Sequence, residues 1–521
     1  MLSLTPPAEL EIKLRIPRSA IAQLLRHPAL ARHKSGRAGR RKLRSTYFDT
    51  ANLRLANAGI GVRLRRDGRK WIQTAKGPPD AASGGGLAAR PEYEWALGTS
   101  PKAPPLDTTR LATTPWRRLL LKAARSGLEP KFITEFIRTE IPLELPEATT
   151  AVLAVDVGAL RAVGPPRYLE ICEIELELAS GNVAQLFRLA AELALDLPLS
   201  LEPASKAARG TRLVSGDTAK PVRAENAELA RDRSAGEALA AIMRACLRQI
   251  EGNADGLLRD DDPEWIHQMR IGTRRLRACL SLVSRLVTSE PLSRLITDVK
   301  WLASALGTAR DLDVLAVETL PILRRGSDPT ALHGIRSLAA KVAAQRKRAR
   351  VNARDAVASR RFVGLILCAG GLAATPEFAA PGKSATDPST GTAAREFAAH
   401  VLARRQKKLL HRGEGLPTAP AEARHAARIA AKKLRYATEF FADLFPGKRA
   451  RRYRKSLTRL QDVLGVMNDA AVAARLAREI AGPDSNAAAL LQGWAAAQAT
   501  LAAPELARAW RDFARAKTFW D

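Results

Sequence analysis

Cysteine and aromatic residues are scarce in this chain of 521 residues, in which aromatic side chains make up only 5%. The four cysteines, Cys172, Cys246, Cys279 and Cys368, lie far apart and form neither a CxxC pair nor the His/Cys spacing of a zinc site. These absences exclude a disulfide-rich scaffold and a zinc finger. They favour a reducing, intracellular compartment.

Long hydrophobic runs are also missing. The longest, FVGLILCAGGLAA, is broken by glycines, and it is shorter than the roughly 20 residues that a membrane-spanning helix needs. The start, MLSLTPPAEL, lacks the charged region and apolar core of a signal peptide. We therefore expect a cytoplasmic protein that does not enter the membrane.

Positive charge is abundant, since 84 Lys and Arg against 53 Asp and Glu give a formal net charge of +31. Such an excess favours polyanionic partners, namely nucleic acid, anionic lipid or phosphate polymers. Nucleic acid is the weaker candidate, because the few aromatic residues do not interleave with a basic patch as base-stacking side chains do. The length of the chain predicts two or three domains.

Charged residues in residues 1–210 follow the alternation of β-strands. In ELEIKLRI, residues Glu9, Glu11 and Lys13 share one face of a strand and leucine and isoleucine share the other. The pattern recurs in GVRLRR, WIQTAKG, PEYEWAL and CEIELEL. A solvated outer face would explain one such strand. Whole strands that are acidic or basic favour a closed antiparallel barrel with a wet, charged lumen, covered outside by helices.

An acidic and a basic set in one cavity predict a site for a metal-bound polyphosphate. Carboxylates suit Mg²⁺ or Mn²⁺, which take oxygen ligands and bridge to substrate phosphates. Lysine and arginine suit the phosphate oxygens themselves. Neither set alone would indicate this chemistry.

The first half resembles the CYTH superfamily, the triphosphate tunnel metalloenzymes. The resemblance covers about residues 7–210 and rests on the ExExK motif at 9–13 and on YFDTANLRL, GVRLRR, WIQTAKG, EYEW, FIRTEI, DVG, EICEIELEL and EPASKAARG. It implies catalytic roles for Glu9, Glu11 and Lys13. It implies phosphate-binding roles for Lys13, Arg63, Arg65, Lys76, Arg138 and Lys206, and metal-binding roles for Glu9, Glu11, Asp156, Glu173 and Glu175. Glu92, Glu94 and Glu177 are assigned less firmly.

The resemblance also implies an activity. We expect metal-dependent hydrolysis of inorganic triphosphate to pyrophosphate and phosphate, achieved mainly by positioning and charge neutralisation. Two alternatives stay open at this point. One is a non-catalytic polyphosphate-binding protein, and the other is a hydrolase or cyclase that acts on an organic triphosphate.

The second half repeats itself. HQMRIGTRRLR at 267–277 returns as HAARIAAKKLR at 425–435, an offset of 158 residues. Both copies read as long helices, and one constant offset indicates a duplication. Each copy carries a basic stripe, within an arc of about 80° on a helix; the stripes are His267, Arg270, Arg274 and Arg277, and His425, Arg428, Lys432 and Arg435. A solvated face is the alternative, with ion pairs from Asp311 and Asp313 joining neighbouring helices.

This half resembles the CHAD domain, a conserved-histidine α-helical domain associated with polyphosphate binding. The resemblance rests on the two stripes and on LGTARDLDV, and it implies two duplicated four-helix bundles whose basic faces bind polyphosphate. The second copy departs at Asn468 and Ala471, where the first has Arg310 and Asp313. We therefore expect an α+β multidomain chain: a tunnel domain at 1–210, a linker at 211–231, and a helical domain at 232–515 with a connector at about 375–394.

Overall fold

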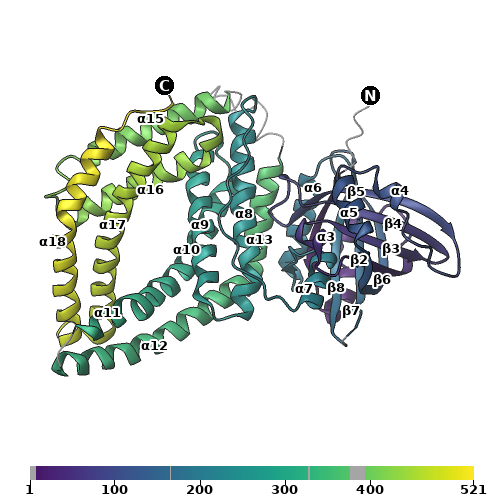
Figure 1. The fold of residues 1–521 in the computed structure, drawn as a ribbon, viewed down its shortest axis with the longest axis horizontal. Coiled ribbons are helices and arrows are strands. Elements are labelled where there is room, and N and C mark those ends of the chain that lie inside the picture. The colour runs from purple at the N-terminus through teal and green to yellow at the C-terminus, as the bar shows by residue number, and fades with distance from the viewer. Residues whose placement is uncertain (1–7, 165, 327–328, 376–392, 521) are drawn as a thin grey trace. The chain divides into compact units, whose positions relative to one another are not determined.

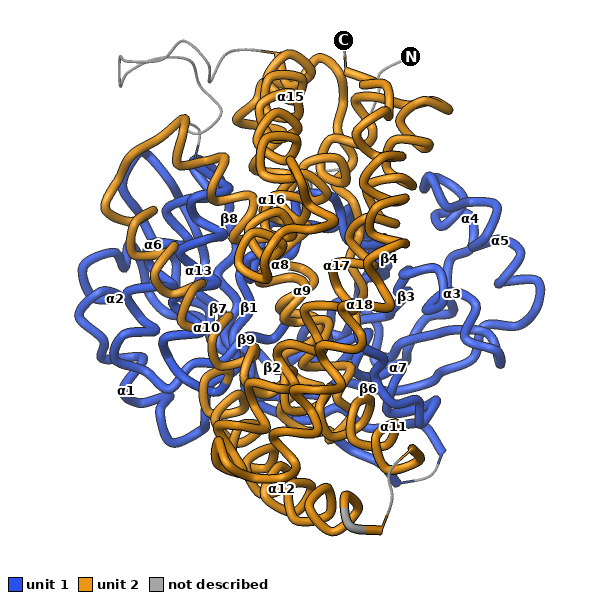
Figure 2. The backbone as a smooth tube through the Cα atoms, turned by 90° about the vertical axis from the view of Figure 1, so that its left-hand side faces the viewer, with its two compact units in different colours: residues 1–221, 358–375 blue, residues 222–357, 376–521 orange. Residues whose placement is uncertain are grey.

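The computed structural model describes residues 8–164, 166–326, 329–375 and 393–520. They fall into two compact units, shown in different colours in Figure 2. One comprises residues 1–221 and 358–375, and the other residues 222–357 and 376–521. The predicted connector at 375–394 lies almost wholly outside the described residues.

The first unit is a closed antiparallel barrel (Figure 1). Its eight long strands are β1 (Ala8–Arg15), β2 (Gly39–Asp49), β3 (Gly61–Asp67), β4 (Lys70–Lys76), β5 (Leu87–Thr99), β6 (Glu129–Leu145), β7 (Thr149–Ala162) and β8 (Tyr168–Ser180). They follow the order β5-β4-β3-β2-β6-β7-β8-β1, and pairing of β5 with β1 closes the ring. A two-residue strand, β9 (Ser200–Leu201), extends one edge of β1. The predicted barrel is confirmed.

Strand alternation divides the barrel residues between lumen and exterior. On β1 the charged side chains point inward, while Ile12 and Leu14 face out and are fully buried under covering elements. On the other side of the barrel, Leu55, Val62 and Leu120 belong to an apolar cluster between the strands and short helices. The helices of this region are η1 (Arg18–Ala20), α1 (Ile21–Leu25), α2 (Pro28–His33), α3 (Arg54–Asn57), α4 (Thr108–Leu111) and α5 (Arg117–Arg125).

Two longer helices follow the last barrel strands. They are α6 (Ala184–Asp196), which packs on β1 and β8, and α7 (Lys206–Ser215), which packs on β6 and β7. Inward-facing Leu43, Phe132 and Leu160 form an apolar cluster, against which Leu213 and Val214 of α7 pack. One part of the lumen is therefore filled by side chains. Helix α7 also extends five residues into the linker predicted at 211–231.

A helix from far along the chain completes the barrel unit. This helix, α13 (Arg360–Ala374), is the apolar run noted in the sequence, and it packs against α6. Its contact is close, because a Cβ atom added at Gly370 would lie 2.4 Å from the Phe187 ring and 2.6 Å from the Gly85 carbonyl oxygen. A helix that is apolar on nearly all sides must be buried. Residues 358–375, which fall within the range predicted for the helical domain, thus belong to the barrel unit.

A matched pair of substitutions tests this packing. Gly370→Ala is expected to destabilise the barrel unit by about 1–3 kcal/mol, because the added methyl overpacks the contact with Phe187. Gly364→Ala, on the same helix, adds a methyl where no neighbour lies within 4 Å. It should be neutral or stabilising by up to about 1 kcal/mol, as alanine favours the helix. Hydrogen exchange of the barrel strands during urea titration measures both, and equal effects would contradict the packing.

The second unit is helical and duplicated (Figures 1 and 2). The first copy contains α8 (Ala235–Arg259), α9 (Pro263–Val283), α10 (Glu290–Val314), a π-helical segment (Leu315–Thr319), α11 (Leu320–Arg325) and α12 (Pro329–Ala358). The second contains α15 (Ala394–Arg412), α16 (Ala421–Phe440), η4 (Ala442–Leu444), α17 (Lys448–Ala481) and α18 (Asn486–Ala514). Adding 158 to the first residues of α9 and α10 gives the first residues of α16 and α17, which confirms the repeat. The copies meet where α8 packs on α15 and α9 on α16.

Ion pairs differ between the copies. Asp313 of α10 is buried and accepts hydrogen bonds from Arg346, at 2.5 Å, and Arg350, at 3.3 Å, of α12. The corresponding residue of α17 is Ala471, which carries no charge, so the second copy lacks these ion pairs.

Membrane-spanning potential is weak among the described helices. None is by itself long and apolar enough to cross a bilayer, and only the bent pair of α12 and α13, taken together, satisfies length and composition.

Candidate active site

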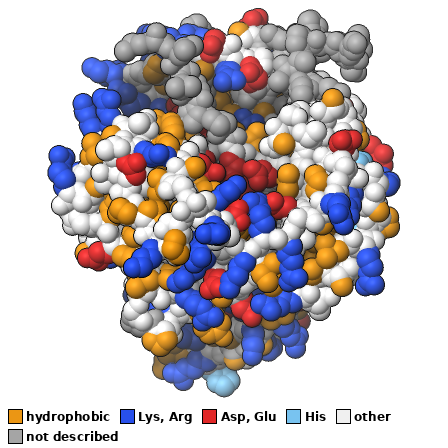
Figure 3. All heavy atoms as spheres, turned by 90° about the vertical axis from the view of Figure 1, so that its right-hand side faces the viewer, with side chains coloured by type: hydrophobic (Ala, Val, Ile, Leu, Met, Phe, Trp, Pro, Cys, Tyr) orange, Lys and Arg blue, Asp and Glu red, His pale blue; other side chains and the backbone are white. Residues whose placement is uncertain are grey.

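The barrel encloses a cavity of about 600 Å³ that both acidic and basic side chains line. All six basic residues predicted to bind phosphate lie on its wall; they are Lys13, Arg63, Arg65, Lys76, Arg138 and Lys206. Three of the five predicted metal-binding carboxylates, Glu9, Glu11 and Glu175, lie there too. In Figure 3, which faces the barrel unit, acidic side chains gather in a hollow with basic ones beside them.

The register of the strands explains which charges meet. Glu11 of β1 lies opposite Glu177 of β8, and Lys13 lies opposite Glu175. The Lys13 ammonium group contacts Glu11 at 3.1 Å and Glu175 at 2.9 Å. Although burial opposes ionisation, Lys13, Lys206 and Arg138 together hold the pKa of the Glu175 carboxyl well below its usual range. Glu175 is therefore already compensated by protein cations.

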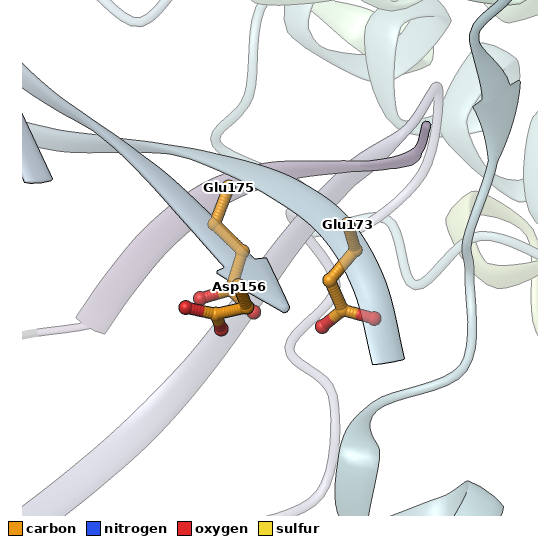
Figure 4. A group of neighbouring side chains, drawn as sticks. All are labelled: Asp156, Glu173 and Glu175. Atoms are coloured by element: carbon orange, nitrogen blue, oxygen red, sulfur yellow. The ribbon is translucent and has the colours of Figure 1, made fainter. Parts of the chain in front are cut away.

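Asp156 and Glu173 lie behind the cavity wall rather than on it, and both are fully buried. With Glu175 they form a group of carboxylates whose oxygens lie within 4.8 Å of one another (Figure 4). Arg138 donates two hydrogen bonds of 2.7 Å to Asp156, and Lys206 contacts all three carboxylates. In this arrangement the triad positions the two cations, Arg138 and Lys206, that face the cavity.

A second layer of ion pairs supports the triad. Arg209 of α7 contacts Glu173 and also Glu202, at 3.2 Å, and Arg15 contacts Glu202 at 2.6 Å. Sequence reasoning did not select Arg209 or Glu202. Their positions in EPASKAARG, three residues after and four before Lys206, were the available signal, but the spacing does not show whether they face the lumen or lie behind it.

Removing Arg209 should destabilise the fold. Arg209→Met leaves the buried Glu173 carboxylate with one cation fewer, and breaking a buried pair in this way costs about 3–5 kcal/mol. The same change at Arg212, which is exposed one turn further along α7, should cost less than about 0.5 kcal/mol. Urea denaturation followed by far-ultraviolet circular dichroism gives both free energies. A loss at Arg209 no larger than at Arg212 would refute the supporting role.

Glu9, Glu11 and Glu177 form a different environment, in which negative charge is under-compensated. Glu9 pairs with Lys76 and Glu11 with Lys13, but Glu177 has no ion-pair partner among the described residues. Burial, followed by the nearby Glu9 and Glu11, raises the pKa of Glu177 to about 7. Burial also raises the pKa of Glu11, and Glu175 and Glu9 add to this effect while Lys13 opposes it. Carboxylates crowded in this way are stabilised by a cation. Their hard oxygen ligands, facing a cavity lined by lysine and arginine side chains, fit Mg²⁺ or Mn²⁺.

Arg65 is the predicted phosphate-binding residue that has no described carboxylate within ion-pair distance, a property it shares on the cavity wall with Arg90 and Arg212. Burial, and then the neighbouring Arg63 and Arg138, lower its pKa to about 10. Arg63, by contrast, contacts Glu92 at 3.2 Å and Glu94 at 3.5 Å. Arg65 thus has free donors that point into the cavity.

Other lining residues were assigned less firmly or missed. Glu92, Glu94 and Glu177 all face the cavity. Arg90 does as well, pairing in register with Glu9. It lies two residues before Glu92, so strand alternation alone could have identified it.

In the helical unit, the middle parts of the two basic stripes come together. Four cations lie there: Arg270 and Arg274 of α9, and Arg428 and Lys432 of α16. Burial, and then repulsion within this group, lowers the pKa of Arg270, Arg428 and Lys432. We call these four residues the central cluster. Arg270 contacts Asp311 at 3.5 Å, and Arg428 contacts Asp469 at 3.7 Å, as the repeat requires.

The ends of the stripes behave differently. His425 is in hydrogen-bond contact with Asn468, at 3.3 Å, whereas Nδ1 of His267 is buried without a partner among the described residues. Arg435 pairs with Glu439 at 3.1 Å. Arg277 is exposed and lies near Lys433 rather than in the central cluster.

Comparison with known families agrees with this architecture. Residues 7–211 match the family model of the CYTH domain, and residues 241–478 match that of the CHAD domain. The chain is therefore a CYTH domain followed by a CHAD domain, and it belongs to the CHAD family.

Individual relatives cover the two halves separately. The CHAD domain from the plant Ricinus communis, a solved structure, is 33% identical and covers 57% of this chain and 98% of its own, with a TM-score of 0.50. An inorganic triphosphatase from Haemophilus influenzae is 33% identical over 173 residues. That match covers 33% of this chain, and it spans about half, 46%, of the relative.

Proposed function

We propose that the barrel unit hydrolyses inorganic triphosphate to pyrophosphate and phosphate with Mg²⁺ or Mn²⁺, and that the helical unit binds polyphosphate. The observation that carries the first part is the cavity wall, where ten lysine and arginine side chains and a group of under-compensated carboxylates face one space. The relative named as an inorganic triphosphatase supports the same assignment. The central cluster supports the second part.

Each residue set has a distinct task in this proposal. Arg65 and its neighbours bind the phosphate oxygens and stabilise the charge that develops on the leaving pyrophosphate. Glu9, Glu11 and Glu177 hold the divalent ion, whose contribution is to neutralise phosphate charge and orient the attacking water. Water adds to the terminal phosphorus as the bond to the bridging oxygen breaks.

Inorganic triphosphate fits better than an organic triphosphate because three of the four aromatic rings of the wall are already in contact with a ring or a cation. Tyr47 stacks on Phe132, with ring centroids 4.5 Å apart. Phe136 is covered by Lys206 at 5.0 Å and Arg138 at 5.8 Å. Of the four lining rings only Phe48 has no ring or cation stacked on it among the described residues, so the wall offers a base little aromatic surface.

A substrate panel tests the catalytic proposal. Phosphate release should be fastest with tripolyphosphate, slower with ATP and thiamine triphosphate, and dependent on Mg²⁺ or Mn²⁺. Faster release from an organic triphosphate would move the assignment to that substrate. Tight binding of tripolyphosphate without release would show that the barrel is a binding module.

The pH dependence of polyphosphate binding tests the helical unit. Burial and the neighbouring Arg274, Arg428 and Arg270 lower the pKa of Lys432 to about 6. Above that pH the amine is neutral, and as the pH falls through 6 it gains a charge. Affinity for polyphosphate should therefore rise several-fold between pH 7.5 and 5.5. Lys432→Met should flatten this rise, leaving the smaller contribution of His267, and an unchanged profile would argue against the cluster.

A further inference from the structure

A second group of cations lies on one outer face of the helical unit, away from the central cluster. Three of its members, Arg404, Lys408 and Arg412, are exposed on α15. Arg277 of α9, Arg285 just after α9, and Lys433 of α16 are also exposed. We call these six residues the outer basic face.

Buried Arg405 shows that the three segments form one surface. This residue is 7% exposed, and its guanidinium group donates hydrogen bonds to the Lys433 carbonyl of α16 and, at 3.3 Å, to the Ser281 hydroxyl of α9. Arg404, Lys408 and Arg412 then follow one another along α15 at intervals of about 6 Å, one helical turn. Arg277 and Arg285 flank Ser281 at the same spacing on the α9 side.

Charge on this face is not compensated. None of the six residues, nor Arg405, forms an ion pair with a carboxylate in the described parts of the chain. Burial and then Arg285 lower the pKa of Arg405 to about 10. Burial, Lys408, Arg405 and Arg412 lower the pKa of Lys433 in the same way. An ordinary solvated face would intersperse acidic residues, as the central cluster does with Asp311 and Asp469.

The duplication shows that the fold does not require these cations. Helices α8 and α15 begin 159 residues apart, and subtracting either 158 or 159 from 404, 408 and 412 gives only buried residues of α8, namely Ala245, Cys246, Gln249, Ile250, Asn253 and Ala254. The corresponding positions are thus buried in one copy and carry a row of exposed charges in the other. A role in holding the repeat together would have appeared in both.

We propose that the outer basic face is a second site for linear polyphosphate, which continues the central cluster along α9. This proposal rests on polyphosphate binding by the helical unit. Arg277 lies three residues after Arg274, so the α9 stripe connects the two groups. Rows of cations one turn apart match a flexible chain that carries a charge on every unit, and none of the residues that form the face is aromatic, as base stacking would require.

Chain length is the distinguishing property of such a site. A long chain can occupy both groups at once, so its second contact is intramolecular and adds avidity. Tripolyphosphate is too short to do so. Loss of the outer face should therefore weaken binding of long chains and leave tripolyphosphate hydrolysis in the barrel unchanged.

The test uses the full chain with Arg404, Lys408 and Arg412 all changed to Gln. Its matched control changes Lys341, Lys347 and Arg348, three exposed cations of α12 without a described ion pair, to Gln. Binding of labelled long-chain polyphosphate is measured across a salt series. We expect the α15 variant to bind about tenfold more weakly, as three lost ion contacts of modest strength imply. It should also show a shallower salt dependence.

Other results overturn the proposal. Equal losses in the two variants would mean that only net charge matters, and no loss in either would mean that the face is not used. Duplex DNA that displaces the polyphosphate at moderate salt would assign the face to nucleic acid. Wild-type protein that fails to bind long-chain polyphosphate at all would instead refute the proposed function of the helical unit.

Discussion

Arg65→Ala is expected to lower kcat/KM for tripolyphosphate by about 10²–10³-fold, the usual effect of deleting a preorganised group that stabilises transition-state charge. Among the six residues predicted to bind phosphate, Arg65 is the one whose donors no described carboxylate engages. Its terminal nitrogens are therefore available to phosphate, while its Nε is buried. Steady-state phosphate release at saturating metal measures the loss.

Two further variants test whether the guanidinium group of Arg65 accounts for the loss of activity. Arg65→Lys keeps the charge and loses the planar fork, so it should recover activity only in part. Arg66→Ala removes the next arginine, which faces the exterior and lies over the Trp71 ring at 5.9 Å. It should leave kcat/KM within about twofold of the wild type, because surface changes away from the site are usually small. If Arg65→Ala keeps most of the activity, the unpaired guanidinium is not a phosphate contact.

Glu11→Gln should lower kcat/KM by a comparable factor, but this loss should depend on the metal concentration. The glutamine removes one negative charge from the under-compensated group beside Glu9 and Glu177, so the metal ion binds more weakly. We expect kcat/KM at low Mg²⁺ to fall by about 10²-fold, within the range seen on loss of an ionic group at such a site. Raising the metal concentration should restore part of it. Activity of the wild type should vanish with EDTA.

The control for this substitution is Glu140→Gln. Glu140 also lines the cavity, but it pairs with Arg41 and is partly exposed. Its loss should leave the metal titration unchanged. A midpoint that shifts equally in both variants would indicate a general charge effect, and no shift at Glu11 would place the metal elsewhere, with the triad of Asp156, Glu173 and Glu175 as the first alternative.

Alternation along single strands was enough to predict the barrel and the side that the charges face. It gave no depth. Arg138 and Lys206 reach the cavity, whereas Asp156, on the same inward side, ends as a fully buried counter-ion behind them. That difference depends on the register between β6, β7 and β8, which pairs Arg138 with Asp156 and Asp156 with Glu173. A single sequence does not reveal the register.

The helical half was predictable for a different reason. A repeat without gaps fixes equivalent positions, so the starts of α16 and α17 follow from those of α9 and α10. The stripe arc, however, placed Arg277 with Arg274, while the structure turns it toward Lys433. Helical periodicity gives the direction of each side chain around its own helix axis, but it does not show where a neighbouring helix crosses that axis.

The late position of α13 in the chain has a consequence for synthesis. Arg360 of α13 donates a hydrogen bond to the Leu195 carbonyl of α6 from 165 residues downstream. A nascent chain that has released every barrel strand from the ribosome therefore still exposes the apolar side of α6. Contacts between such distant residues form slowly, and transiently exposed apolar surface invites aggregation. Ribosome-bound chains halted before residue 358 should accordingly recruit chaperones more than chains halted beyond residue 375.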